Sequence, residues 1–185
     1  MELTTERLVL REYTTTDFDA VHDFATNPRT LVFVDWGPNS EQDTLDFLNF
    51  CTTTAHAVPR TGYTLAIAVA GAVIGSVGLT VHHGTAAEIG YTINPTHWGK
   101  GYATEAANAL LTFGFSELSL ERITATCRPE NAASAGVLAK LGMTQTGRLE
   151  NDRLIRGAWL DSLVFGIDAP KPSPELAPAS TCNTQ

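Results

Sequence analysis

The sequence has few of the features that mark disulfide-bonded, metal-binding or membrane proteins. Only three of its 185 residues are cysteines, Cys51, Cys127 and Cys182, and their odd number and spacing fit neither a disulfide framework nor a metal site. We expect free thiols in a reducing compartment, no metal and no cysteine chemistry. The longest apolar run, residues 65–79, is too short and too interrupted by glycine to span a membrane, and the N-terminus lacks a cationic signal-peptide start. We therefore expect a cytoplasmic protein that does not bind membranes.

Positive charge is also scarce. The chain has 12 lysines and arginines against 20 aspartates and glutamates, which gives a formal net charge of −8 at pH 7. Because a nucleic-acid surface normally needs a basic face, this charge argues against nucleic acid as a partner. An acidic surface would suit a cationic amine acceptor, although acidity also serves solubility alone.

One ordinary domain accounts for most of the chain. The length and the hydrophobic content of 43% fit a single domain with a full core. From Ala169 onward, prolines and small residues replace any hydrophobic period. We therefore predict a folded domain over residues 1–168 and a flexible C-terminal tail over residues 169–185.

A strand, a glycine loop and a helix start follow one another in the middle of the chain. Residues 88–93 alternate as a strand does, and Asn94-Pro95 ends the strand. Gly99 and Gly101 follow, and from Ala103 onward apolar residues recur at helical spacing. Backbone N–H groups at a helix start lack intrahelical partners, and glycines let a phosphate approach them. This segment therefore predicts an anion-binding site.

Two common phosphate-binding motifs are absent from this loop. A Walker loop needs Gly-x-x-x-x-Gly-Lys-Ser/Thr, whereas Lys100 is followed by Gly101 and has no glycine at the required upstream position. A dinucleotide fingerprint would need glycine or alanine at Thr104 and would normally follow the first strand of its domain. Nucleoside triphosphates and dinucleotides are therefore disfavoured.

From Trp98 the loop reads Trp-Gly-Lys-Gly-Tyr-Ala, which resembles the coenzyme A signature Gln/Arg-x-x-Gly-x-Gly/Ala of the GCN5-related N-acetyltransferase (GNAT) superfamily. Tryptophan in the first position is similar to the RimJ/RimL-like branch, the ribosomal-protein N-terminal acetyltransferases. Three further stretches resemble that branch in the same order: residues 5–11, Asn131-x-x-Ser134 and residues 140–143. The resemblance covers roughly residues 4–168.

The resemblance implies an α/β fold of the α+β type, with a mixed, mostly antiparallel sheet of seven strands, a central splayed parallel pair and about four helices. The sequence pattern places strands at residues 7–13, 64–69, 72–82, 88–93, 122–128, 143–153 and 158–167, and helices at 16–26, 40–55, 103–114 and 131–141. Thr16 and Asp19 are predicted to form a capping box at the first helix.

Acetyl-CoA is the cosubstrate that the resemblance implies. Backbone N–H groups of residues 100–104 would hold its pyrophosphate, Asn131 would bond the pantetheine arm, and the N–H near Ile93 would serve the oxyanion. Lys140 is either a contact to the adenosine phosphate or a solvated lysine. The candidate cofactor-binding residues are Ile93, Trp98, Gly99, Lys100, Gly101, Tyr102, Ala103, Thr104, Asn131 and Lys140.

The proton donor for the leaving thiolate is expected on the helix that follows Asn131. Many superfamily members carry a tyrosine seven residues after this asparagine, where the present chain has Leu138. Ser134 resembles the substitute of the RimJ/RimL-like branch, which hydrogen-bonds the thiolate. The competing interpretation is a plain helix-start serine.

The base and the acceptor contacts are less determined. Glu88 is the first choice as base, and His82, His83, Asp35 or a water molecule are alternatives. In relatives of this fold the two early helices and their loop wall the acceptor pocket. Asp35 and Trp36 are therefore candidate substrate contacts, although Trp36 equally suits a core position. His82, at the turn after the strand 72–82, is a further candidate substrate contact.

The predicted function is direct transfer of an acetyl group from acetyl-CoA to a primary amine, either a protein N-terminus or a small molecule, by a monomer or a homodimer. A non-catalytic acyl-CoA-binding sensor of the same fold is the alternative, because Leu138 replaces the usual general acid. Release of free thiol with a panel of amines distinguishes the two. A nucleotide-binding regulatory module is a third interpretation, which fails if ATP does not compete with coenzyme A.

Removal of residues 169–185 should leave folding and acetyl transfer intact, because this tail offers no apolar face to bury. The test compares melting temperature and rate of thiol release between the truncated and the full chain. A loss of solubility or activity would show that the tail docks on its own subunit or on a neighbour.

Overall fold

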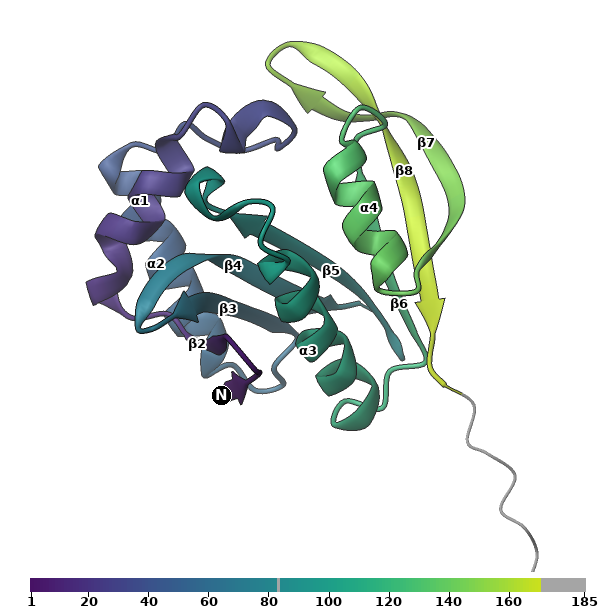
Figure 1. Cartoon of the computed structure of the whole chain (residues 1–185), viewed down its shortest axis with the longest axis horizontal. Helices are drawn as coiled ribbons and strands as arrows, with labels where there is room; N and C mark the ends of the chain where they lie inside the picture. The colour runs from purple at the N-terminus through teal and green to yellow at the C-terminus, as the bar shows by residue number, and fades with distance from the viewer. Residues whose placement is uncertain (83, 171–185) are drawn as a thin grey trace, which may run out of the picture.

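The computed structural model of the chain describes residues 1–82 and 84–170, which form one eight-stranded sheet with helices on both faces (Figure 1). The strand order is β1-β2-β3-β4-β5-β6-β8-β7. The strands are β1 Glu2–Thr4, β2 Val9–Glu12, β3 Gly62–Val69, β4 Ala72–Val81, β5 Ala86–Ile93, β6 Arg122–Cys127, β7 Thr144–Ile155 and β8 Ala158–Asp168. The α-helices are α1 Phe18–Thr26, α2 Glu41–Ala55, α3 Tyr102–Ser116 and α4 Ala132–Lys140, and the 3-10 helices are η1 Thr15–Asp17, η2 Thr30–Val32 and η3 Pro95–His97. Within the described residues, no helix has the length and apolar character needed to cross a membrane.

The mixed sheet and the four α-helices confirm the predicted fold class, but the sheet has eight strands instead of seven. The additional strand is β1, which pairs antiparallel with β2 and places Leu3 opposite Leu10. Three residues are too few to give a strand pattern of their own, so only the exposed edge of β2 defines this strand. The predicted tail beyond residue 170 lies outside the described residues.

The first helix begins differently from the prediction. The capping box lies at η1, the 3-10 turn that leads into α1, and it is formed by Thr14 and Asp17, two residues before the predicted pair Thr16 and Asp19. The carboxylate of Asp17 accepts hydrogen bonds from the guanidinium of Arg11 at 2.7 and 2.8 Å and from the N–H of Thr14 at 2.8 Å. The arginine on the preceding strand therefore fixes which acidic residue closes the turn.

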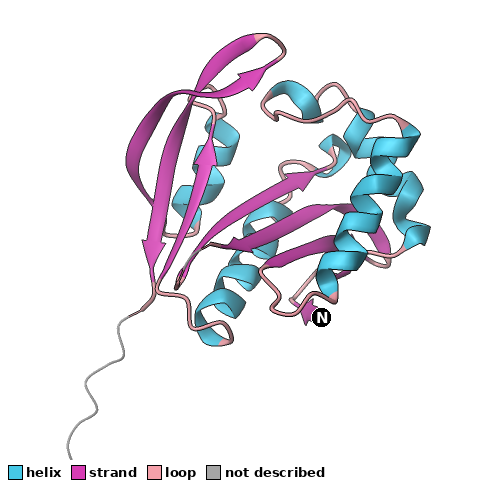
Figure 2. Cartoon of the chain, turned by 180° about the vertical axis from the view of Figure 1, so that it is seen from behind, coloured by secondary structure: helices cyan, strands magenta, loops and turns pink. Residues whose placement is uncertain are grey.

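Strands β5 and β6 form the parallel pair of the described sheet, and they remain paired over only three positions. The pairs run from Ala86 with Arg122 to Glu88 with Thr124. Beyond these residues β5 continues beside β4, whereas β6 continues beside β8. Figure 2 shows that the two strands diverge, which divides the sheet into one half built from β1 to β5 and another built from β6, β8 and β7. This confirms the predicted splayed pair.

Alternation along the strands separates two cores. Leu65 and Ile67 of β3 point to the face covered by α3, where they share a fully buried cluster with Leu110. Ala66 points to the opposite face and packs with Val21 of α1 and Leu48 of α2. Helix α3 therefore covers one face of the sheet, and α1 and α2 cover part of the other.

Five neighbouring positions on the part of that second face which α1 and α2 leave open carry small residues. Thr64, Gly78 and Gly90 lie side by side across β3, β4 and β5, and Ser76 lies beside Thr92. We call these five residues the floor. Because none of them is large, space remains above the central strands beside the point where β5 and β6 separate.

Candidate active site

The loop between β5 and α3 contains two glycines in a backbone conformation that other residues rarely adopt. The φ angles are 76° at Gly99 and 83° at Gly101. Gly101 is the N-cap of α3 and brings no side chain that could cap the first helical turn. The N–H groups of this turn therefore stay available to a ligand, and the helix dipole adds partial positive charge there. The strand, loop and helix lie where the sequence predicts them.

The N-terminal segment anchors this loop, which the sequence analysis missed. Arg7 Nη1 donates to the carbonyl oxygen of Lys100 at 2.9 Å, and Arg7 Nε donates to Glu105 Oε2 at 2.7 Å. The same guanidinium lies 4.9 Å from the ring centroid of Tyr102, and Thr5 Oγ1 donates to Glu105 Oε1 at 2.6 Å. Burial would raise the pKa of Glu105, but the hydrogen bonds from Thr5 and Arg7 outweigh it and hold the pKa below its ordinary value. The resemblance at residues 5–11 was the signal in the sequence that could have indicated this role of the N-terminal segment.

Trp98 ties the other end of the loop to the sheet. Its indole N–H donates to the carbonyl oxygen of Ile93 at 2.7 Å, and the guanidinium of Arg29 lies 5.0 Å from its ring centroid. The tryptophan thus has a structural role within the chain. A contact between Trp98 and a cofactor stays a prediction.

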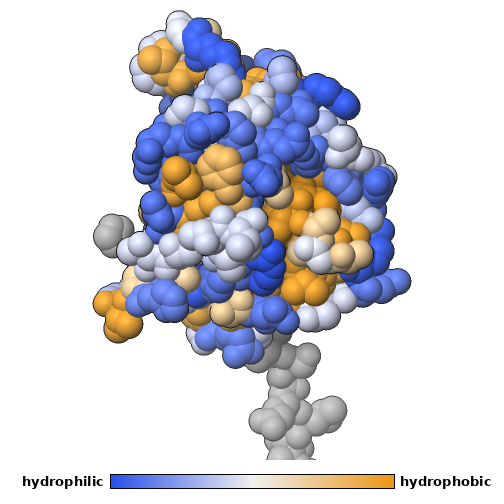
Figure 3. All heavy atoms as spheres, turned by 90° about the vertical axis from the view of Figure 1, so that its left-hand side faces the viewer, coloured by the Kyte–Doolittle hydropathy of each residue, from blue (hydrophilic) through white to orange (hydrophobic). Residues whose placement is uncertain are grey.

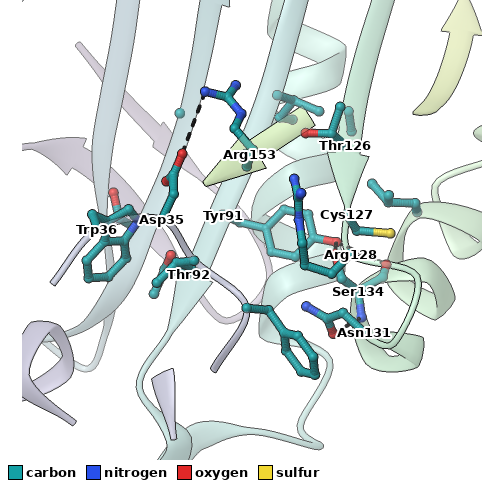
Figure 4. A pocket seen from close by; sticks show the side chains of 18 of the residues that line it. Asp35, Trp36, Tyr91, Thr92, Thr126, Cys127, Arg128, Asn131, Ser134 and Arg153 are labelled. Atoms are coloured by element: carbon teal, nitrogen blue, oxygen red, sulfur yellow. Dashed lines mark hydrogen bonds and ion pairs between the residues drawn. The ribbon is translucent and has the colours of Figure 1, made fainter. Parts of the chain in front are cut away.

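A cavity of about 370 Å³ occupies the space where β5 and β6 separate (Figure 4). We call it the central cavity. It brings together four residues that the sequence predicts for the site, namely Asp35, Trp36, Asn131 and Ser134, and it also reaches Leu138. Its other lining residues come from the loop after η2, from β5 and the floor, from the end of β6 and from β7, and they include Phe33, Val34, Ile89, Tyr91, Thr126, Cys127, Arg128, Arg153 and Ile155.

Ser134 of α4 meets a tyrosine that the sequence analysis did not consider. The hydroxyl of Tyr91 on β5 lies 3.0 Å from Ser134 Oγ and 3.2 Å from the backbone carbonyl oxygen of Ser134. Burial is the main cause that raises the pKa of Tyr91 to about 12, so the phenol stays protonated at neutral pH. The chain therefore places a tyrosine hydroxyl beside Ser134 from the strand, although Leu138 on the helix offers none.

Asn131 forms the N-cap of α4. Its Oδ1 accepts a hydrogen bond from the N–H of Ser134 at 3.0 Å, which fixes the start of the helix and the position of the serine. The side-chain Nδ2 remains as the donor for the predicted contact to the pantetheine arm. Nearby, burial raises the pKa of the Cys127 thiol against the lowering effect of Arg128.

Glu88, His82 and Lys140 lie outside the residues that line the central cavity. Glu88 is on the same face of β5 as the floor, but it accepts a hydrogen bond from Thr126 Oγ1 at 3.3 Å and lies 3.7 Å from His82 Nε2. Its role as base, the substrate contact of His82 and the phosphate contact of Lys140 stay predictions, and His83 lies outside the described residues. Within residues 1–82 and 84–170, His, Cys, Asp and Glu side chains form no group of three that could hold a metal ion.

An ion pair spans the central cavity. Asp35 Oδ2, in the loop after η2, lies 3.6 Å from Arg153 Nη1 on β7, as the dashed line in Figure 4 marks. Arg156 Nη1, at the tip of the β7–β8 hairpin, donates to the carbonyl oxygen of Val34 at 3.5 Å. The loop that carries Asp35 and Trp36 and the tip of the hairpin therefore meet over the cavity, although they lie far apart in the sequence.

Arg128 is a buried cation at the end of β6, with 6% of its surface exposed. Its Nη1 donates to the carbonyl oxygen of Asp161 at 2.9 Å, and its Nη2 lies 3.6 Å from Asp152 Oδ2. These partners belong to β8 and β7. Arg128 therefore holds the hairpin against the end of β6 and keeps that wall of the cavity in place.

This arrangement of strand, glycine loop and separated parallel strands is that of an acetyltransferase. The chain belongs to the acetyltransferase (GNAT) domain family, which matches residues 7–144. It is 32% identical over 169 residues to YnaD of Bacillus subtilis, an uncharacterized N-acetyltransferase, and the match covers 90% of this chain and 96% of that protein. It is 29% identical to p20 of Bacillus licheniformis, also an uncharacterized N-acetyltransferase, over 89% of this chain and 94% of that protein. The predicted superfamily and enzyme class are thereby confirmed.

Solved structures agree with this assignment. An acetyltransferase of the GNAT family from Bacillus anthracis superposes with a TM-score of 0.81 at 30% identity, over 91% of this chain and 98% of that one. RimJ of Mycobacterium smegmatis, which was solved in complex with CoA-disulfide, has a TM-score of 0.78 at 28% identity over 88% of this chain and 82% of that one. The likeness to the RimJ/RimL branch that the sequence predicted is therefore confirmed.

Replacement of Arg7 by alanine should lower the free energy of unfolding at pH 7 by about 0.5–1 kcal/mol, a value discounted because the side chain is partly exposed. A carboxylate with a lowered pKa adds stability above its unfolded pKa and loses it as the pH falls through its folded pKa. The difference between wild type and Arg7→Ala should therefore shrink in acid, once Glu105 is protonated. Urea unfolding at neutral and acidic pH measures it.

The matched control is Arg122→Ala, which removes an exposed ion pair with Asp168 far from the loop. It should leave the affinity for coenzyme A unchanged, whereas Arg7→Ala should weaken it, because the carbonyl of Lys100 loses its anchor. Equal affinities in the two variants would contradict a role of Arg7 in shaping the loop.

Proposed function

We propose that the protein transfers an acetyl group from acetyl-CoA directly to a primary amine, either a small molecule or a peptide N-terminus. The observation that carries the proposal is the central cavity, which connects the gap between β5 and β6 with the floor on the acceptor side. The available N–H groups at the start of α3 and the coenzyme bound to RimJ of Mycobacterium smegmatis support acetyl-CoA as the donor. The cytoplasm is the compartment that best suits this donor and the free thiols.

The pyrophosphate of the donor belongs at the glycine loop. Residues 100–104 offer their N–H groups at the start of α3, and Lys100 adds a point charge. The pantetheine arm then runs between β5 and β6, which no longer pair with each other beyond Glu88 and Thr124. An arm that contains two amide groups can satisfy backbone groups which are otherwise unpaired.

The N–H of Ile93 suits the developing oxyanion. Asn94 donates its N–H to the carbonyl oxygen of Ile74 on β4, and backbone groups alternate in direction along an antiparallel strand. The N–H of the preceding residue, Ile93, therefore points away from β4 and toward the gap. The carbonyl oxygen of Ile93 accepts from Trp98 instead of from β4, as this alternation requires. A donor fixed in this way stabilises negative charge without reorganisation.

The reaction joins the amine nitrogen to the thioester carbon and then breaks the carbon–sulfur bond. The proton lost by the amine must leave, and the sulfur departs as a thiolate that must be stabilised or protonated. In this proposal Ser134 stabilises the thiolate, and Tyr91 positions the hydroxyl of Ser134. Glu88, or a water chain that ends there, remains the proposed route for the amine proton.

Tyr91 has one hydroxyl hydrogen and two acceptors within reach, Ser134 Oγ and the backbone carbonyl oxygen of Ser134. When the tyrosine donates to the carbonyl, the serine hydroxyl donates to the tyrosine oxygen. When the tyrosine donates to Ser134 Oγ, the serine hydrogen is free to point at the thiolate. A rotation of two hydroxyl hydrogens therefore suffices to meet the charge as it forms.

The first test concerns the donor. Acetyl-CoA should raise the melting temperature, since a ligand that binds only the folded form adds about 2.7 kcal/mol at a hundredfold excess over Kd. Gly101→Asp should abolish the shift, because it places a side chain and a negative charge where phosphate meets backbone N–H, at a φ of 83°. An unchanged shift would place the phosphates elsewhere. Free thiol released with an amine present distinguishes transfer from mere binding by a sensor.

The second test concerns Ser134 and Tyr91. Ser134→Ala should slow the single-turnover rate by about tenfold to a hundredfold, and Tyr91→Phe by about two- to tenfold, with the affinity for acetyl-CoA nearly unchanged. Because the tyrosine acts through the serine, the double variant should be no slower than Ser134→Ala alone. A normal rate in Ser134→Ala, with a loss of only about 1 kcal/mol of stability, would reduce the serine to a helix-start residue.

Tyr13→Phe is the matched control for Tyr91→Phe. It also removes a buried tyrosine hydroxyl that donates to a carbonyl oxygen, here that of Gly75 at 3.2 Å, but it lies away from Ser134. The rate of Tyr13→Phe should stay normal when corrected for the folded fraction. If the two variants lose stability and rate alike, Tyr91 has no positioning role.

A further inference from the structure

A second cavity, of about 700 Å³, lies between α1, α2 and the segment from Trp36 to Asn39. We call it the side cavity. Its volume is in the range of sites that hold a small ligand, about 300–1,000 Å³. The surface over α1 and α2 carries apolar patches bordered by hydrophilic atoms, as Figure 3 shows.

The side cavity borders the candidate active site, with which it shares three lining residues. Trp36, Ser76 and Thr92 line both cavities, and Ser76 and Thr92 lie opposite each other on β4 and β5. Thr92 directly precedes Ile93, whose N–H is the proposed oxyanion donor. An amine that reaches the thioester over this part of the floor therefore extends its substituent toward the side cavity.

The walls of the side cavity are mainly apolar and aromatic. Val21 and Phe24 of α1 and Phe47 of α2 line it, and Trp36 stands at the junction with the central cavity. Aromatic rings pack well against such walls in offset or edge-to-face arrangements. A peptide backbone would bring N–H and C=O groups that need partners, and the walls formed by Val21, Phe24 and Phe47 offer none.

The charge of the side cavity determines which charged groups an aromatic acceptor can carry. Among the described residues, the charged side chains that line the side cavity are Asp43 and Asp46, and none of the lining residues there is a lysine or an arginine. Asp43 accepts hydrogen bonds from Ser40, and Asp46 accepts one from Gln42 at 2.8 Å, so both carboxylates are fixed on α2. The cavity therefore attracts an ammonium group and repels a carboxylate.

We propose that the side cavity is the acceptor subsite, and that it selects primary amines whose substituent ends in an aromatic group without a carboxylate, such as arylalkylamines. The inference rests on the proposed acetyl transfer and adds the class of acceptor. The substrate enters as an ammonium drawn by the two aspartates and loses a proton to Glu88 or to the water chain that ends there. The amine then attacks the thioester carbon with its ring in the side cavity, and the coenzyme A thiolate leaves.

Four acceptors test the proposal by thiol release at saturating acetyl-CoA: phenethylamine, ethylamine, 4-(2-aminoethyl)benzoate and a peptide that begins with alanine. An apolar group that fits its pocket is worth about tenfold or more, so kcat/KM for phenethylamine should exceed that for ethylamine by at least this factor. 4-(2-Aminoethyl)benzoate, which differs from phenethylamine only by a carboxylate on the ring, should be as poor as ethylamine or poorer. A preference for ethylamine, the benzoate or the peptide would overturn the subsite and leave the proposed transfer intact.

Variants test whether the walls of the side cavity cause the selectivity for aromatic amines. Phe47→Ala should reduce the ratio of kcat/KM between phenethylamine and ethylamine by about three- to tenfold, because one aromatic wall is lost. Phe50→Ala is the matched control, since Phe50 is 58% exposed on the same helix and lines neither cavity. Its ratio should equal that of the wild type. An unchanged ratio in Phe47→Ala would overturn the proposal.

Since Phe47 also packs against Tyr13, with ring centroids 5.3 Å apart, a second variant keeps the test independent of stability. Asp46→Lys, on the exposed side of α2, should raise KM for phenethylamine severalfold without a change in the melting shift caused by acetyl-CoA. An unchanged KM would contradict the proposed electrostatic attraction between the aspartates and the ammonium group. If the wild type accepts no amine although acetyl-CoA raises its melting temperature, the proposed transfer itself fails, and the subsite fails with it.

Discussion

The early end of the β5–β6 pairing is the constraint on which the site depends. A parallel pair that continued past Glu88 and Thr124 would engage the inward backbone groups of both strands. Instead, β4 holds β5 as far as Ile93, and β8 holds β6 as far as Cys127, so each strand is fixed only on its outer side. The central cavity and the available N–H of Ile93 both follow from this separation.

Unpaired backbone groups in a sheet cost free energy unless water or a ligand pairs with them. Contacts elsewhere must therefore fix the two halves of the sheet in this separated arrangement. The buried guanidinium of Arg128 joins β6 to the hairpin, and Tyr91 reaches across to Ser134 on α4. On the other face, Asp35 and Arg153 meet at 3.6 Å over the opening. These contacts connect the halves around the gap without closing it, which leaves the backbone free for a donor.

Features with a local signal were predicted from the sequence. The glycine loop, the helix starts at Ser40 and Asn131 and the splayed strands lie where pattern and resemblance place them. Features that depend on distant partners were not. Arg7 meets Glu105 across 98 positions and Tyr91 meets Ser134 across 43, and neither pair has a spacing that a sequence pattern reveals. Likewise, Thr14 and Asp17 displaced the predicted capping pair because Arg11 on the preceding strand binds Asp17.

The register of β5 determines which of its side chains face α3 and α4 and which belong to the floor. Tyr91 and Ile93 face α3 and α4, whereas Gly90 and Thr92 belong to the floor, so a slip by one residue would exchange the two sets. Gly75 lies opposite Ile93, and a Cβ there would collide with the carbonyl oxygen of Thr92 and lie 3.0 Å from the Cα of Ile93. Close approach at this end and three parallel pairs at the other fix the strand. The middle of β5 can then carry the site without a partner strand on its inner side.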